Sequence, residues 1–249
     1  MYKVLVLVIA CLAFFGRTDG HSYHLGSCPD VEPQRGFDMK KMLGIWYAVE
    51  KTGTASSCVM YNFSKTDEPY EYELVQTSQH FILKYTPINH IYKYTGRLTV
   101  PDLSTPAKMS VKFPLNVVGT SRFNIITTDY DSYALIFTCQ KLAFANRQSA
   151  TILSREKTLD KDVIGKLRDI LSLNEIDPHD LSIISQTNCP KPTSETNVID
   201  IDDETLSAKT AGNVIRGTGN AIASGAEFAV EGVGTIVDKV RSEKKPEKR

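Results

Sequence analysis

Short runs in which apolar and polar side chains alternate dominate the chain between about residues 38 and 187. In residues 107–113, Met109, Val111 and Phe113 occupy every second position, with polar side chains between them. This alternation places the two sets on opposite faces of a strand, as a half-buried β-strand requires. The pattern predicts an all-β domain with strands at 45–51, 58–64, 71–77, 80–86, 91–100, 107–113, 122–129, 132–140, 148–155 and 181–187. The run 80–86 also fits a hairpin insertion.

One segment follows a helical period instead. Its apolar side chains recur every three or four residues, at Leu159, Val163, Leu167, Ile170 and Leu171. Asp160 and Asp162 suit the positive end of a helix dipole, and Asp177-Pro178 ends the segment. The pattern predicts one amphipathic helix that packs its apolar stripe on the outside of the β-structure.

The first residues resemble a secretory leader. Lys3 precedes the apolar run 4–15, which is too short to cross a bilayer, and Gly20 is a plausible cleavage point. We therefore interpret residues 1–20 as a signal peptide and expect a secreted, extracellular protein.

Four cysteines remain after the leader, at Cys28, Cys58, Cys139 and Cys189. An even number in an oxidising compartment predicts two disulfides, and spacing alone leaves the three possible connectivities open. A zinc site is disfavoured because the sequence has neither a C-x-x-C motif nor a nearby histidine pair. No metal ion or other cofactor is expected.

The charges balance, with 29 basic and 29 acidic residues, so nothing in the composition favours nucleic acid as a partner. The sequence Asn62-Phe63-Ser64 is an N-glycosylation acceptor in a secreted chain.

The composition changes after Cys189. Residues 191–204 form a polar, acidic stretch that we interpret as a linker, and residues 205–249 form a C-terminal extension. Polar residues recur in the extension at eleven-residue spacing, which on a helix aligns them opposite an aliphatic face. Its glycines oppose helix formation in water. The extension is expected to be disordered or conditionally helical, with a lipid surface or a partner helix as its possible target.

Three short motifs occur in order along the β-rich region: Gly44-Ile45-Trp46-Tyr47, Thr128-Asp129-Tyr130 and Leu153-Ser154-Arg155. Together with the cysteines and the helix, they resemble the lipocalins, in particular the secreted apolipoprotein D-like members and their insect Lazarillo-type relatives. The resemblance implies that residues 21–190 form an eight-stranded antiparallel up-and-down barrel with the helix outside. It also implies that Arg155 lies across the ring of Trp46, and that Cys28 pairs with Cys139 and Cys58 with Cys189.

A lipocalin barrel implies a monomer that binds and transports a small hydrophobic molecule, such as a lipid, retinoid, sterol or pigment. The resemblance places Phe63, Thr151 and Leu153 on the pocket wall, although the family has a tryptophan where this chain has Thr151. Alternation along the strands adds Tyr61, Tyr72, Leu74, Tyr92, Tyr94, Met109, Val111, Phe113, Leu135 and Phe137. Tyrosines among aliphatic side chains suit an apolar ligand that carries a polar group.

Enzymatic function is not expected. The sequence has no G-x-S-x-G, H-E-x-x-H, P-loop or dinucleotide-binding motif, and the resemblance assigns every mature cysteine to a disulfide. An alternative function is an extracellular interaction or signalling protein that acts through the C-terminal segment.

Overall fold

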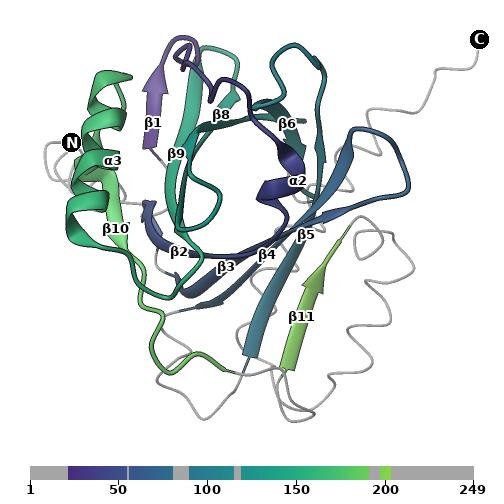
Figure 1. Cartoon of the computed structure of the whole chain (residues 1–249), viewed down its shortest axis with the longest axis vertical. Helices are drawn as coiled ribbons and strands as arrows, with labels where there is room; N and C mark the ends of the chain where they lie inside the picture. The colour runs from purple at the N-terminus through teal and green to yellow at the C-terminus, as the bar shows by residue number, and fades with distance from the viewer. Residues whose placement is uncertain (1–21, 55, 81–89, 115–118, 191–196, 203–249) are drawn as a thin grey trace, which may run out of the picture. The chain divides into compact units, whose positions relative to one another are not determined.

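The computed structural model describes residues 22–54, 56–80, 90–114, 119–190 and 197–202. Eight antiparallel strands follow one another around a closed barrel (Figure 1). They are β2 (Gly44–Thr52), β3 (Ser56–Lys65), β4 (Glu71–His80), β5 (His90–Thr99), β6 (Lys108–Lys112), β7 (Ser121–Thr128), β8 (Tyr133–Lys141) and β9 (Ala145–Ser154). The last strand, β9, pairs with the first, β2, and closes the ring. The predicted up-and-down barrel is therefore confirmed.

Among the described residues, three further strands extend the sheet outside the ring. Strand β10 (Leu181–Ile183), predicted from the alternation, pairs with β2. Strands β1 (Ser22–Leu25) and β11 (Asn197–Ile201) were not predicted, and they pair with β9 and β5. The stretch interpreted as a linker therefore contains a strand. It runs parallel to β5, and Lys93 Nζ lies 2.7 Å from Asp200 Oδ2 across the pair.

Several predictions lie outside the described residues. These are the leader at 1–20, all but the first residue of the run 80–86, and the C-terminal extension at 205–249. The chain divides into two compact units, of which the first spans residues 1–203 and contains the barrel.

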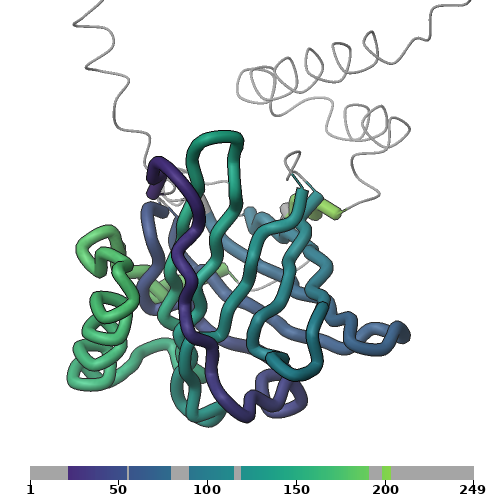
Figure 2. The backbone as a smooth tube through the Cα atoms, turned by 90° about the horizontal axis from the view of Figure 1, so that it is seen from above, coloured from purple at the N-terminus to yellow at the C-terminus, as the bar shows by residue number. Residues whose placement is uncertain are grey.

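Helix α3 (Lys161–Leu173) is the predicted amphipathic helix. Asp160 caps it, because its side chain accepts hydrogen bonds from the backbone N–H groups of Asp162 and Val163 at 2.8 and 3.3 Å. The helix lies outside the ring of strands in both views (Figure 1, Figure 2). A four-residue helix, α2 (Met39–Met42), precedes β2, and a short 3-10 helix (Pro178–Asp180) precedes β10.

The apolar side chains form two separate clusters, one inside the barrel and one under α3. The outer cluster contains Leu135, Phe137, Ile152, Leu167 and Leu171. The inner cluster contains Trp46, Phe63, Leu74, Leu98, Met109, Val111, Phe123, Ile136 and Leu153. The barrel wall therefore buries apolar surface on both faces where the helix covers it.

Both disulfides have the pairing that the resemblance implies. Cys28 joins Cys139 and Cys58 joins Cys189, with sequence separations of 111 and 131 residues. The first ties the N-terminal arm to β8, and the second ties the segment after β10 to β3. Cross-links that close loops this long restrict the unfolded chain and stabilise the fold.

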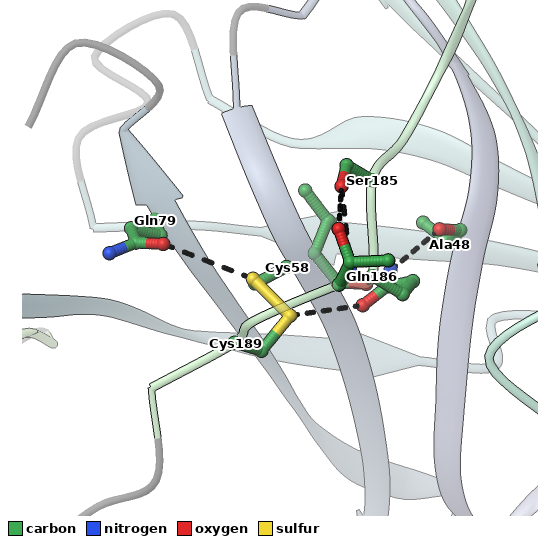
Figure 3. The surroundings of a disulfide bond; sticks show 8 residues. Ala48, Cys58, Gln79, Ser185, Gln186 and Cys189 are labelled. Atoms are coloured by element: carbon green, nitrogen blue, oxygen red, sulfur yellow. Dashed lines mark hydrogen bonds between the residues drawn. A yellow bond between two sulfur atoms is a disulfide. The ribbon is translucent and has the colours of Figure 1, made fainter. Parts of the chain in front are cut away.

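The Cys58–Cys189 disulfide lies where strands β2 and β3 separate (Figure 3). The pairing of β2 with β3 ends at Tyr47 and Met60, so Ala48 and Val59 have no partner across this strand pair. The buried side chain of Gln186 donates to the carbonyl oxygens of Ala48 and Val59, at 2.7 and 2.8 Å. The segment after β10 thus supplies a hydrogen-bond donor to one backbone carbonyl of each strand at the point where β2 and β3 separate.

Candidate ligand-binding site

One end of the barrel is closed by Trp46, which is completely buried. Its indole N–H donates to the carbonyl of Met42 in α2 at 2.8 Å. The guanidinium carbon of Arg155 lies 3.8 Å from the centre of the indole ring, which is cation-π geometry. The predicted contact between Arg155 and Trp46 is therefore present.

Arg155 also holds together the segments that meet at this end. Its guanidinium donates to the carbonyl oxygens of Lys41, Leu43, Ile45 and Tyr130, at distances between 2.9 and 3.1 Å. A planar group with several fixed donors suits this role better than a lysine would. Arg155 thus satisfies four backbone carbonyls where these segments meet, which is a structural role.

The Thr128-Asp129-Tyr130 motif forms the turn between β7 and β8. Burial alone would raise the pKa of the Asp129 carboxyl, but hydrogen bonds from Ser132, Tyr133 and Asp131 hold that pKa below its usual value. The Tyr130 hydroxyl accepts a hydrogen bond from the backbone N–H of Asp38 at 2.9 Å. The turn is thereby connected to the chain that enters the barrel.

The pairing register identifies the side chains that face the interior. Directly opposed residues in an antiparallel sheet share a face, so Trp46 defines the inward row. That row continues through Tyr61 on β3, Gln76 on β4 and Tyr94 on β5. A second row runs through Phe63, Leu74 and Gly96 in the same way.

Most of the predicted site residues lie on this inward face. Tyr61, Phe63, Leu74, Met109, Val111 and Leu153 belong to the inner cluster, and Tyr72 and Phe113 pack against it. Tyr92 and Tyr94 share the inward face of β5 with Leu98, and Thr151 lies opposite Ile136 of the inner cluster. Ten of these eleven residues come from five strands of the barrel, β3, β4, β5, β6 and β9, and Phe113 directly follows β6.

The prediction for Leu135 and Phe137 is wrong. Both side chains belong to the cluster under α3, and the inward positions on β8 are Ala134 and Ile136. The predicted alternation is present on β8, but the face that carries Leu135, Phe137 and Cys139 is the outer one.

Two tyrosines lie on β5, where the inward face becomes polar. Tyr92 contacts His90 edge-on, with ring centres 5.4 Å apart. Burial raises the pKa of the Tyr94 hydroxyl, and the neighbouring Tyr92 raises it further. The raised pKa keeps the Tyr94 phenol protonated near neutral pH, so this residue presents an O–H group as well as an apolar ring face.

Lys51 is an inward-facing residue that sequence analysis missed. The register shifts between Ala48 and Glu50, so Ala48 and Lys51 oppose the inward Leu153 and Thr151, whereas Glu50 opposes the outward Ile152. Without this bulge, alternation from Trp46 and Ala48 would direct Glu50 inward and Lys51 outward. The local sequence of β2 contains no signal that predicts this bulge.

Asn62 is exposed on the outer face of β3, where a glycan would project away from the interior.

Within the described part of the chain, no helix is both long and apolar enough to span a membrane. The same residues contain no group of three or more His, Cys, Asp or Glu side chains arranged to hold a metal ion.

The closed barrel, the outer helix and the Trp46–Arg155 end define a lipocalin, and the chain belongs to the lipocalin family. The model of the lipocalin / cytosolic fatty-acid binding protein family matches residues 88–188. Within this family the chain is of the apolipoprotein D type. It is 31% identical to apolipoprotein D of Bos taurus over 195 residues, which cover 77% of this chain and 99% of the bovine chain.

Insect lipocalins are more distant relatives. The Lazarillo protein of Schistocerca americana is 24% identical over 158 residues, which cover 60% of this chain and 70% of that protein. The structure of insecticyanin from the tobacco hornworm Manduca sexta superposes with a TM-score of 0.58 at 19% identity, covering 74% of this chain and 99% of the other. The structural similarity to insecticyanin supports the assignment of the lipocalin fold. Lipocalins are generally binding and transport proteins, so family membership supports the binding of a small hydrophobic ligand.

Proposed function

We propose that the protein is a secreted, monomeric carrier that binds a small hydrophobic molecule inside its barrel. The observation that carries this proposal is the composition of the inward face. Apolar and aromatic side chains extend from the floor at Trp46 through Phe63, Leu74 and Leu98, and tyrosines follow toward the other end. Burial of an apolar ligand against such a wall is favourable in proportion to the area removed from water.

Secretion is supported by the leader at residues 1–20 and by the two disulfides, which persist in oxidising compartments. The exposed position of Asn62 is compatible with glycosylation. Binding is expected to be reversible and non-covalent.

Ligand titration tests the proposal. The purified full-length protein is titrated with a panel of retinoids, fatty acids and sterols, and tyrosine and tryptophan emission reports occupancy. The variant Phe63→Asp is expected to weaken binding strongly, because an uncompensated carboxylate in the barrel disfavours an apolar ligand.

The control is Ile183→Asp, which places the same charge on an exposed side chain of β10. It should bind like the parent. If the parent bound no member of the panel, or if both variants bound as well as the parent did, the barrel would not be the binding site.

A further inference from the structure

An ammonium group and three hydroxyl groups meet on the inward face of the barrel. Lys51 Nζ lies 3.0 Å from the Tyr61 hydroxyl and 3.3 Å from each of the Ser149 and Thr151 hydroxyls. These residues come from strands β2, β3 and β9. Tyr61, Ser149 and Thr151 are buried, with 4 to 5% of each residue exposed.

The charge of Lys51 is not balanced by a carboxylate in the described part of the chain, where no ion pair includes it. The adjacent carboxylate, Glu50, faces the other way and pairs with Arg168 of α3 through two hydrogen bonds of 2.9 Å. The bulge between Ala48 and Glu50 thus separates two neighbouring charges, and the cation is the one directed inward.

The three hydroxyls surrounding Lys51 retain the capacity to donate. Each accepts a hydrogen bond from the ammonium, and a hydroxyl that accepts can still donate its own hydrogen. Among the described residues, none of the three donates to a protein acceptor in the hydrogen bonds of the structure. The cluster therefore presents one positive charge and three O–H donors, which together match an acceptor-only anion.

We infer that the barrel recognises an amphipathic acid, with the ligand carboxylate bound at Lys51, Tyr61, Ser149 and Thr151 and the apolar tail directed toward Trp46. This inference rests on the proposed function and specifies its ligand class. A carboxylate supplies two acceptor oxygens and the negative charge that the site lacks. A neutral ligand of the same length fills the apolar part of the barrel but leaves the ammonium without a counter-charge.

A matched pair of probes separates the two contributions. cis-Parinaric acid and its methyl ester share one fluorescent chain and differ in charge, and both brighten on burial. The full-length protein is titrated with each probe at neutral pH, and the ratio of the two dissociation constants is measured. We expect the parent to prefer the acid by on the order of tenfold or more, the range for a charge-assisted hydrogen bond.

Lys51→Met should remove that preference and leave the affinity for the ester within about twofold, since methionine retains most of the aliphatic stem. Lys51→Arg keeps the charge and should keep the preference for the acid. The control Lys141→Met removes an equal charge from an exposed position on β8 and should bind both probes like the parent.

Three results overturn the inference. Equal affinity of the parent for acid and ester would remove the ligand class while leaving the proposed carrier function intact. A parallel loss of both probes in Lys51→Met would assign that residue a structural role. Binding of neither probe by the parent would overturn both this inference and the proposed function.

Discussion

Glu50 and Lys51 are consecutive in the chain, but their side chains lie on opposite sides of the barrel wall. Glu50 contacts Arg168 of the outer helix at 2.9 Å, and Lys51 contacts the inward Tyr61 at 3.0 Å. The register shift after Ala48 produces this separation. One extra residue in β2 thus links α3 to the wall and gives the interior a positive charge.

Removal of Arg168 should destabilise the protein, because Glu50 is only 4% exposed and would lose its counter-charge. Loss of one partner of a fully buried pair costs about 3–5 kcal/mol. Since 38% of the Arg168 side chain is exposed, we expect Arg168→Met to lower the free energy of unfolding by about 2 kcal/mol in urea titrations.

The double variant Glu50→Gln/Arg168→Met should recover part of that loss, because it removes the buried charge as well. Arg122→Met, at an exposed position on β7, is the control and should leave stability near the parental value. Equal stability of the single variant, the double variant and the parent would show that the pair does not anchor the helix.

Arg155→Met should weaken the closed end of the barrel. The substitution removes the contact with Trp46 and the hydrogen bonds to four backbone carbonyls. We expect a loss of about 2–4 kcal/mol in the free energy of unfolding. Because Trp46 is the only tryptophan, its emission should shift to longer wavelength in the folded variant. Unchanged emission together with unchanged stability would contradict this role of Arg155.

Asp129 should make stability depend on pH in the acid range. Its folded-state pKa is lowered, so the unfolded state binds the proton more readily than the folded state. The resulting stabilisation is fully present above the ordinary carboxyl pKa of about 3.9, and it is lost as the pH falls through the depressed value. Urea unfolding of the parent and of Asp129→Asn between acid and neutral pH measures the effect. The asparagine variant should be less stable near neutrality and should show a flatter acid limb; identical limbs would exclude Asp129 as the source.

Phe137 and Tyr94 should separate fold stability from ligand binding. Phe137 lies under α3, so Phe137→Ala should cost about 3–5 kcal/mol of stability while affinity for cis-parinaric acid stays within about twofold. Tyr94 is half-buried on the inward face, so Tyr94→Ala should weaken binding on the order of tenfold. A larger loss of affinity for Phe137→Ala than for Tyr94→Ala would place the ligand outside the barrel.

The sequence predicts the architecture well because several independent signals agree on it. Alternation indicates the barrel strands, the helical period indicates α3, and the motif containing Trp46 indicates the closed end. The choice between the two faces of one strand is less secure. Leu135 and Phe137 share a face with Cys139. The disulfide from Cys139 to Cys28 ties that face to the N-terminal arm, which runs outside the barrel. That shared face was the available signal that both side chains point outward.

Other features of the site depend on tertiary context. The bulge that directs Lys51 inward is stabilised by the segment containing Gln186, which contacts Ala48 from 138 residues away. Strand β11 forms because β5 offers a free edge beyond its short pairing with β6. Both depend on which backbone groups remain unsatisfied after the barrel closes, and the local sequence does not encode that information.

The location of a bound ligand tests the central claim most directly. In a complex with uniformly 13C-labelled palmitic acid, isotope-filtered NMR should detect intermolecular NOEs from the ligand chain to the inward side chains of Leu74, Leu98 and Tyr94. NOEs that connect the ligand to Leu135 and Phe137 instead, or the absence of any ligand NOE to the inward face in a saturated complex, would contradict the account.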